Sequence, residues 1–167
     1  MSNPERPALP DDIVEQLNRT RGGFNETVGL RFVSATYDEV VGEIDVGPRH
    51  QQPYGLAHGG VYATLIETLA SVGAAVNEAP RGQHTVGIEN TTSFLRAVRT
   101  GILRGTAVPL TRGRRSHVWE VTLRDDAGRL VATGRVRMLC VPHGNAIAGE
   151  TVTVVSGRRS WDDSSSA

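Results

Sequence analysis

Several residues in one short segment have the types and spacing needed for chemistry on a carbonyl group. The segment reads QQPYGLAHGGVYATLIETLASVG, from Gln51 to Gly73. It is mostly small and apolar, as a buried helix is, yet it contains a glycine pair and a carboxylate. The candidate functional residues are His58, Gly59, Gly60, Glu67 and Ser71.

The His-Gly-Gly sequence predicts a helix start that can donate hydrogen bonds. If His58 begins the helix, the N–H groups of Gly59, Gly60 and Val61 have no partner within it, and the helix dipole adds positive charge there. Glycine also lets another molecule approach the backbone closely. Such a site suits a carbonyl oxygen that becomes an oxyanion. A glycine-rich start required only for tight packing explains the same residues, so this motif alone leaves both interpretations open.

Glu67 lies among apolar residues, between Leu65-Ile66 and Leu69-Ala70. Ser71 is four positions later and therefore on the same helical face. The usual alternative is an exposed glutamate. A carboxylate in apolar surroundings is costly unless it is paired or functional, which favours a functional role. We also expect the fold not to depend on this carboxylate, because the sequence offers it no partner that the fold requires.

The spacing between these groups predicts self-association. Glu67 is eight residues beyond Gly59, a rise of about 12 Å along one helix. A single helix therefore cannot bring its own N-terminus and its own carboxylate to one small group. If the two act together, we expect them to come from antiparallel helices of two subunits.

The pattern around this segment predicts one α+β domain, with a curved antiparallel sheet wrapped around one long helix. A hairpin over 28–46 turns at Asp38-Glu39, and the helix spans about 58–77. Strands follow at about 85–95, 102–110, 116–124 and 130–141, separated by glycine-containing turns. Residues 1–27 form a lead with a short helix that ends at Gly22-Gly23. Residues 143–167 form an extension that is partly disordered by composition, with a possible extra strand at 151–155.

Composition narrows the classes of partner. The 167 residues carry no net charge, so no overall field attracts nucleic acid or an anionic membrane. All 18 basic residues are arginine, a side chain suited to phosphate. Cys140 is the only cysteine, which excludes an internal disulfide and fits a reducing compartment. The N-terminus lacks a signal pattern and the longest apolar run is interrupted by Glu67, so we expect a cytoplasmic protein that does not enter membranes.

Together these spaced residues resemble the active-site signature of hot-dog-fold acyl-CoA thioesterases. The resemblance is to the PaaI-like branch of the 4-hydroxybenzoyl-CoA thioesterase superfamily, which also contains the enterobactin proofreading thioesterase. It extends over about residues 28–141 and includes the stretches SFLRAVRTG and RGRRSHVWEV. It implies a homodimer or homotetramer that splits a CoA thioester into a carboxylic acid and free CoA, without a metal or other cofactor.

The resemblance also implies a role for each residue. The Gly59 N–H polarises the thioester carbonyl, and His58 assists or shapes that pocket. Gln52 orients the carbonyl or the attacking water. Glu67 of the neighbouring subunit is general base or nucleophile, two roles that the resemblance leaves open, and Ser71 holds water or the thiol region.

A basic turn is the first candidate for binding the CoA phosphates. It contains Arg114, Arg115 and Ser116, directly after Arg112, with Arg96 and Arg99 as weaker candidates. A solvated turn would have the same composition. The remaining histidines lack metal-ligand spacing, so no metal site is expected.

Other functions fit the sequence less well. An α/β-hydrolase would require a G-x-S-x-G sequence, which is absent, and the His-containing motif of a hot-dog dehydratase is also missing. A non-catalytic acyl-CoA-binding or regulatory hot-dog protein is the main alternative. It would not need Gln52, Glu67 and Ser71 together, because binding alone requires no base.

Overall fold

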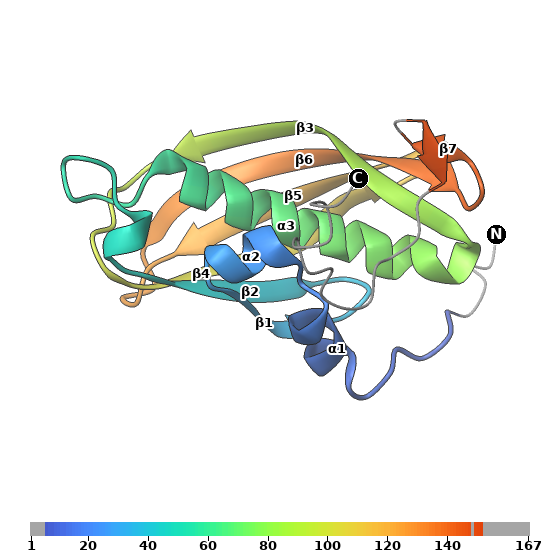
Figure 1. The fold of residues 1–167 in the computed structure, drawn as a ribbon, viewed down its shortest axis with the longest axis horizontal. Helices are drawn as coiled ribbons and strands as arrows, with labels where there is room; N and C mark the ends of the chain where they lie inside the picture. Colours follow the sequence, from blue (N-terminus) through green and yellow to red (C-terminus); the bar gives the residue numbers. More distant parts are fainter. Residues whose placement is uncertain (1–5, 148, 152–167) are drawn as a thin grey trace, which may run out of the picture.

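A six-stranded antiparallel sheet curves around one long helix in this computed structural model, which describes residues 6–147 and 149–151 (Figure 1). The helix is α3, Gly59–Glu78. The strand order across the sheet is β1-β2-β4-β5-β6-β3. The strands are β1 Leu30–Ala35, β2 Val40–Val46, β3 Gln83–Phe94, β4 Gly101–Arg112, β5 Ser116–Arg124 and β6 Leu130–Pro142. The predicted fold class, hairpin, central helix and four later strands are confirmed.

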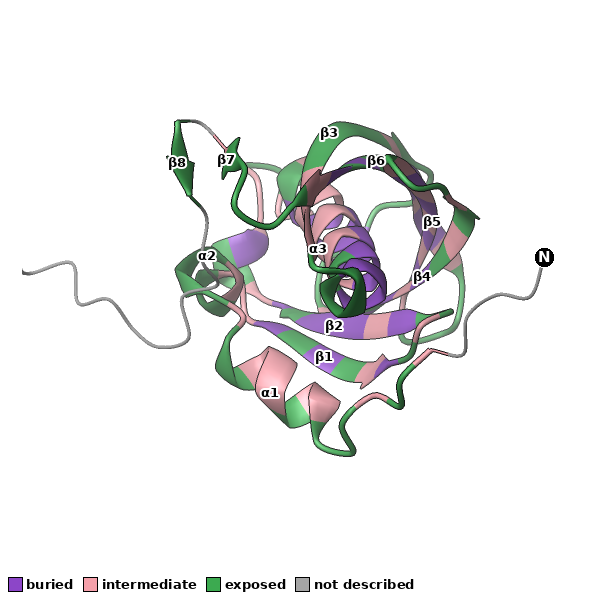
Figure 2. Ribbon diagram, turned by 90° about the vertical axis from the view of Figure 1, so that its right-hand side faces the viewer, coloured by how far each residue is buried: buried purple, intermediate pink, exposed green. Residues whose placement is uncertain are grey.

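The core lies between α3 and the concave face of the sheet. Viewed along the helix axis, the sheet surrounds much of α3 (Figure 2). Strand β5 shows the expected alternation, with Trp119, Val121 and Leu123 fully buried against the helix. A Cβ atom added to Gly73 of α3 would lie 2.6 Å from the Trp119 ring. The helix therefore approaches the sheet closely where the largest core side chain lies.

Short elements surround this core, and most of them were not predicted from the sequence. The predicted N-terminal helix is α1, Ile13–Arg19, and it is followed by an unpredicted second helix, α2, Gly23–Thr27. Helix α1 ends at Arg19, before the predicted Gly-Gly end, and Gly22, with φ +79°, is the N-cap of α2 instead. The 3₁₀ turns are η1 Pro48–His50 and η2 Ala79–Arg81, and a small hairpin pairs β7 Ala146–Ile147 with β8 Glu150–Thr151. The predicted strand at 151–155 lies mostly outside the described residues.

The two edges of the sheet differ in how they are covered. Helix α1 lies along β1, and the Asn18 side chain bonds both backbone groups of Phe32, accepting from its N–H and donating to its C=O at 2.9 Å each. Strand β3 forms the other edge, and among the described residues it has a hydrogen-bonded neighbour on one side only. Its hydrophobic side chains Ile88 and Phe94 are more than half exposed. This edge is available for pairing with another strand.

The central helix also has the length and composition of a membrane span. Residues Gly59–Arg81 have a mean hydropathy of 1.3 over an 18-residue window, and half of that window is buried inside the fold. The core helix of a globular domain has these same properties, because it is apolar on most of its faces.

We predict that Asn18→Ala lowers the free energy of unfolding by about 1–2 kcal/mol, because two backbone groups of a buried strand lose their partner. Chemical denaturation measures the change. Glu15→Ala, an exposed position on the same helix, is the control and should change stability by less than about 0.5 kcal/mol. Equal effects in the two variants would show that Asn18 does not secure the β1 edge.

Candidate active site

Side chains from α3 and β3 hold the Glu67 carboxylate in a defined position. Ser71 Oγ donates to Glu67 Oε1 at 3.2 Å, and Asn90 Nδ2 donates to Oε2 at 2.9 Å. Thr92 Oγ1 in turn donates to Asn90 Oδ1 at 2.8 Å, which directs the amide NH₂ group toward the carboxylate. Glu67 and Ser71 are partly exposed. The predicted pairing of these two residues is present, and each carboxylate oxygen accepts one hydrogen bond.

The β3 backbone passes very close to this carboxylate. A Cβ atom added to Gly87 would lie 2.2 Å from Glu67 Oε1, so only glycine fits there without displacing the carboxylate. The β3–β6 register shifts between Gly87 and Glu89, a β-bulge that changes the course of the strand at this point. The bond from Asn90 is a partner that the sequence analysis did not identify, because it comes from β3, which is remote in sequence.

Sequence reasoning missed Asn90 and Gly87. One signal could have found Asn90, since asparagine is depleted in strands and this position lies on the same face of β3 as the inward-facing Thr92. No signal identified its partner, because Asn90 and Glu67 are 23 residues apart.

The helix start has the predicted donor geometry. His58 is the N-cap, and its Nδ1 accepts from the Gly60 N–H at 2.9 Å. The neutral ring therefore carries its proton on Nε2. Among the described residues, no group accepts the N–H of Gly59. The cap thus uses the Gly60 N–H and leaves the Gly59 N–H as the donor available to a ligand.

A cavity of about 280 Å³ lies beside this helix start. Gln52, Tyr62, Phe94 and Arg96 are among its lining residues. The Phe94 ring is in contact with the helix start, since a Cβ atom on Gly59 would lie 3.0 Å from its Cζ. Gln52 Oε1 accepts from the Tyr54 N–H at 2.8 Å, which leaves the NH₂ group of the amide to face a ligand.

Tyr62 is a buried lining residue of this cavity and contributes a hydroxyl group to its wall. The Val98 N–H donates to Tyr62 Oη at 3.2 Å. Burial raises the pKa of the Tyr62 hydroxyl, and the Val98 bond opposes this only in part. The phenol therefore stays protonated at neutral pH and contributes a neutral wall to the cavity.

The candidate residues form two groups within one chain. Gln52, His58, Gly59 and Gly60 gather at the helix start, whereas Glu67 and Ser71 lie further along α3. The helix is continuous between them, so the groups are separated by a rise of about 12 Å. One chain alone does not bring them together.

The basic turn between β4 and β5 lies at the other end of α3. Arg114 and Arg115 are exposed, and the next inward residue, His117, contacts Glu78 at the last position of the helix. Arg112 is already paired, with Nη1 2.6 Å from Asp38 Oδ1. The turn is therefore remote from the helix start of its own chain.

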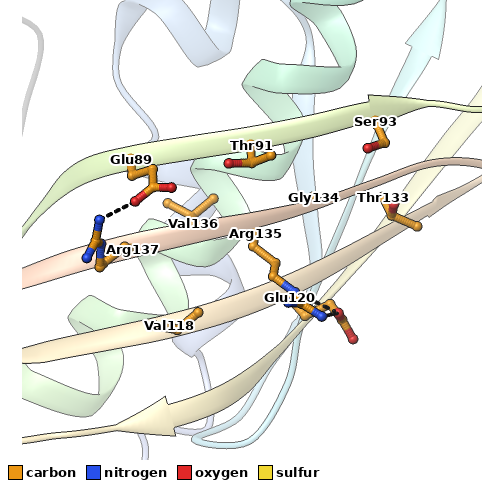
Figure 3. A pocket seen from close by; sticks show the side chains of 10 residues that line it. All are labelled: Glu89, Thr91, Ser93, Val118, Glu120, Thr133, Gly134, Arg135, Val136 and Arg137. Carbon is orange, nitrogen blue, oxygen red and sulfur yellow. Dashed lines mark hydrogen bonds and ion pairs between the residues drawn. The ribbon is translucent and has the colours of Figure 1, made fainter.

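A larger hollow of about 740 Å³ lies on the outer face of the sheet (Figure 3). Two ion pairs cross it, Arg137 with Glu89 and Arg135 with Glu120. Thr91 lies opposite Arg135, and Ser93 and Thr133 supply hydroxyl groups at the end of the hollow away from Arg137 and Glu89. None of the predicted catalytic residues lines this hollow, which is shallow and internally paired, so it is not the candidate site.

Known protein families and sequences that resemble this chain agree with this architecture. Residues 54–132 match the family model described as the thioesterase superfamily. Rv1847 of Mycobacterium tuberculosis is 42% identical over 117 residues, which cover 69% of this chain and 84% of that protein. The proofreading thioesterase EntH of Cronobacter turicensis is 38% identical over 124 residues, covering 74% and 90% respectively.

The chain belongs to the thioesterase superfamily. A solved structure of a variant of the thioesterase PA1618 from Pseudomonas aeruginosa superimposes with a TM-score of 0.75 at 30% identity, covering 81% of this chain and 96% of that one. The hot-dog fold and the family predicted from the sequence are therefore confirmed. Membership of this superfamily supports thioester hydrolysis as the class of reaction that takes place at this site.

We predict that Asn90→Ala lowers kcat for thioester hydrolysis about 10- to 100-fold, because a hydrogen bond to a charged group is lost. Steady-state kinetics and thermal unfolding of the variant measure the effect on turnover and on stability separately. Thr91→Ala, which removes the adjacent side chain on the outer face, is the control. A purely structural role for Asn90 would lower the melting temperature and leave kcat of the folded protein unchanged.

Proposed function

We propose that this protein hydrolyses an acyl-CoA thioester to a carboxylic acid and free CoA, in a site assembled from two copies of the chain. The observation that carries the proposal is the free Gly59 N–H at a helix start, on the same rigid helix as a fixed carboxylate about 12 Å further along. The N–H group and the carboxylate each suit chemistry on a carbonyl, but within one chain they lie too far apart to act on the same carbonyl.

The uncovered β3 edge supports association of two copies. If β3 pairs with β3 of a second copy about a two-fold axis, the two sheets continue into each other and the two α3 helices lie antiparallel. Glu67 is bonded to β3 through Asn90, so it lies on this side of the helix. In such a pair the carboxylate of one chain faces the helix start of the other.

The chemistry then follows from the charges that develop during hydrolysis. The Gly59 N–H and the helix dipole stabilise the negative oxygen that forms on the thioester carbon. Gln52 donates to the carbonyl or orients the water, and His58 fixes the turn by capping the helix. The partner's carboxylate at position 67 takes a proton from the attacking water or attacks the carbonyl itself. Ser71 and Asn90 keep that carboxylate in place.

Variants of a relative support the pairing of these two side chains. Two solved structures of SAV0944 from Staphylococcus aureus, one described as a thioesterase, replace by alanine a glutamine at position 32 and a glutamate at position 47. They are 26% and 25% identical to this chain, each with a TM-score of 0.69. The separation of fifteen residues is also that between Gln52 and Glu67.

The arginine turn fits the CoA portion in the same arrangement. In an antiparallel pair of helices, the C-terminal end of one α3 lies beside the start of the partner's α3. The basic turn at that end contains Arg114, Arg115 and Ser116, so it lies on the same side as the partner's helix start. The exposed guanidinium groups suit the CoA phosphates there. Arg96 lines the helix-start cavity of its own chain and is a second phosphate donor.

We predict that Glu67→Gln lowers thioester hydrolysis about 10²- to 10⁴-fold, the usual contribution of a general base. Thiol release from a panel of aromatic and aliphatic acyl-CoA substrates measures it and also ranks the acyl groups. Glu89→Gln, on the outer face of β3, is the matched control. Equal turnover in wild type and Glu67→Gln would exclude this mechanism. Saturable acyl-CoA binding without turnover in wild type would identify a binding protein instead.

We predict that Gly59→Pro lowers turnover about 10²- to 10³-fold, because it removes the proposed oxyanion donor. Gly59 is the first helical residue and His58 is extended, so proline fits the backbone here. Gly59→Ala adds a Cβ atom but keeps the N–H, and it is the control for contact with Phe94. Retained activity in Gly59→Pro would exclude the backbone donor.

The shared site can be tested by mixing the two inactive chains. If Glu67→Gln and Gly59→Pro chains are unfolded and refolded together, half of the random dimers are mixed, and one site in each mixed dimer has both groups intact. Activity should then recover to about a quarter of the wild-type value. No recovery, with mixed dimers demonstrated by mass spectrometry, would mean that both groups act within one chain.

A further inference from the structure

Three metal-ligating side chains converge at the end of α3 that is remote from His58. Glu78 is the last residue of the helix, His117 lies on β5 and Cys140 lies on β6. Their candidate donor atoms all lie within 4.8 Å of one another. Glu78 and His117 are fully buried, and Cys140 is 8% exposed. Three elements far apart in sequence therefore place a carboxylate, an imidazole and a thiol around one point.

The polar atoms of this cluster are not satisfied by the protein. Glu78 Oε2 and both ring nitrogens of His117 are buried without a hydrogen bond among the described residues. His117 Nε2 lies 3.0 Å from Glu78 Oε1, so the imidazole and the carboxylate are in direct contact. A buried polar atom left without a partner destabilises the fold, because it has lost its hydrogen bonds to water. A bound ion would supply the missing partner for several of these atoms at once.

We propose that Glu78, His117 and Cys140 bind one zinc ion. Thiolate, imidazole and carboxylate are the ligands that zinc takes in proteins, and the mixed set suits zinc better than magnesium or calcium, which prefer oxygen alone. One thiolate and one carboxylate neutralise the charge of the ion. A water molecule completes a tetrahedral coordination.

The surrounding charges are compatible with a cation. Arg81 Nη1 donates to Glu78 Oε1 at 2.8 Å and leaves Oε2 free, so the guanidinium can orient the carboxylate as an outer partner of a metal ligand. Arg112 also lies close enough to affect His117, but its charge is paired with Asp38. Arg112 is therefore paired outside the cluster, whereas Arg81 shares the Glu78 carboxylate with the ion and is 42% exposed, so that solvent screens its charge.

Burial prepares the two softer ligands. It lowers the pKa of His117, against an opposing effect of Glu78, so the imidazole is neutral and has a lone pair for a metal. Burial and the nearby Glu78 charge raise the pKa of the Cys140 thiol. Zinc binding therefore releases the thiol proton to solvent as the metal–sulfur bond forms.

The site has a structural role that is separate from hydrolysis. Glu78 lies eleven residues beyond Glu67, about 16 Å along the helix. The ion joins the C-terminal end of α3 to two central strands of the sheet. The Glu67→Gln variant should therefore keep its full zinc content, whether or not the proposed hydrolysis is correct.

Metal analysis of the full chain tests the proposal. Protein purified with zinc and then dialysed should retain about one zinc per chain by elemental mass spectrometry. Cys140→Ser and His117→Gln should lose it. Zinc at 100 times its dissociation constant should raise the melting temperature of metal-free wild type by about 5–10 °C. Cobalt bound to wild type should show thiolate-to-metal charge-transfer absorption, a result that needs no variant to fold.

Two histidines outside the proposed site, His84 and His143, provide the control for adventitious zinc binding. The rings of His84 and His143 stack with centroids 4.1 Å apart, next to the β3–β6 end that carries Cys140. The double variant His84→Gln/His143→Gln should keep its zinc. Loss of zinc in that variant, or a wild type that retains no zinc and shows no cobalt–thiolate absorption, would overturn the proposal.

Discussion

The burial of one long apolar helix is the constraint on which the rest of this structure depends. Helix α3 carries large apolar side chains such as Leu65, Ile66 and Leu69 on several faces, and all three are fully buried. A flat sheet covers only one face of a helix, so the strands must curve around α3 to exclude water. Close approach requires small residues at the contact, as Gly73 shows beneath Trp119. Shape and core composition therefore follow from a single element.

The same constraint determines where polar chemistry can occur. Polar groups on α3 are tolerated at its ends and beside the β3 edge of the sheet, where other polar groups can reach them. The helix start has the capping histidine and the free Gly59 N–H, Glu67 lies beside the β3 edge, and the helix end has Glu78. Each position is fixed by a rigid helix, which holds functional groups more precisely than a loop does. These groups are therefore held rigidly, but within one chain they lie too far apart to act on one small substrate group.

The unequal edges of the sheet connect this division to self-association. Asn18 bonds Phe32 at the β1 edge from within the chain, whereas β3 has a paired neighbour on one side only in the part of the chain that the structure describes. Glu67 and its partner Asn90 lie at this same β3 side. Pairing through β3 would cover its exposed apolar side chains and complete the divided site in one step. Burial of these apolar side chains and the proposed activity would then both require pairing through β3.

The sequence by itself determined the element order, the central helix and the family, because hydrophobic period, turn residues and a spaced motif are all local signals. It also identified Glu67 and the helix start, where a carboxylate and a glycine pair contradict their apolar surroundings. Only the tertiary structure decided which residues meet across the fold. Asn90 reaches Glu67, and Cys140 approaches Glu78 and His117, because the sheet curves around the helix. No spacing along the chain encodes those distances, since they arise from strand register and packing.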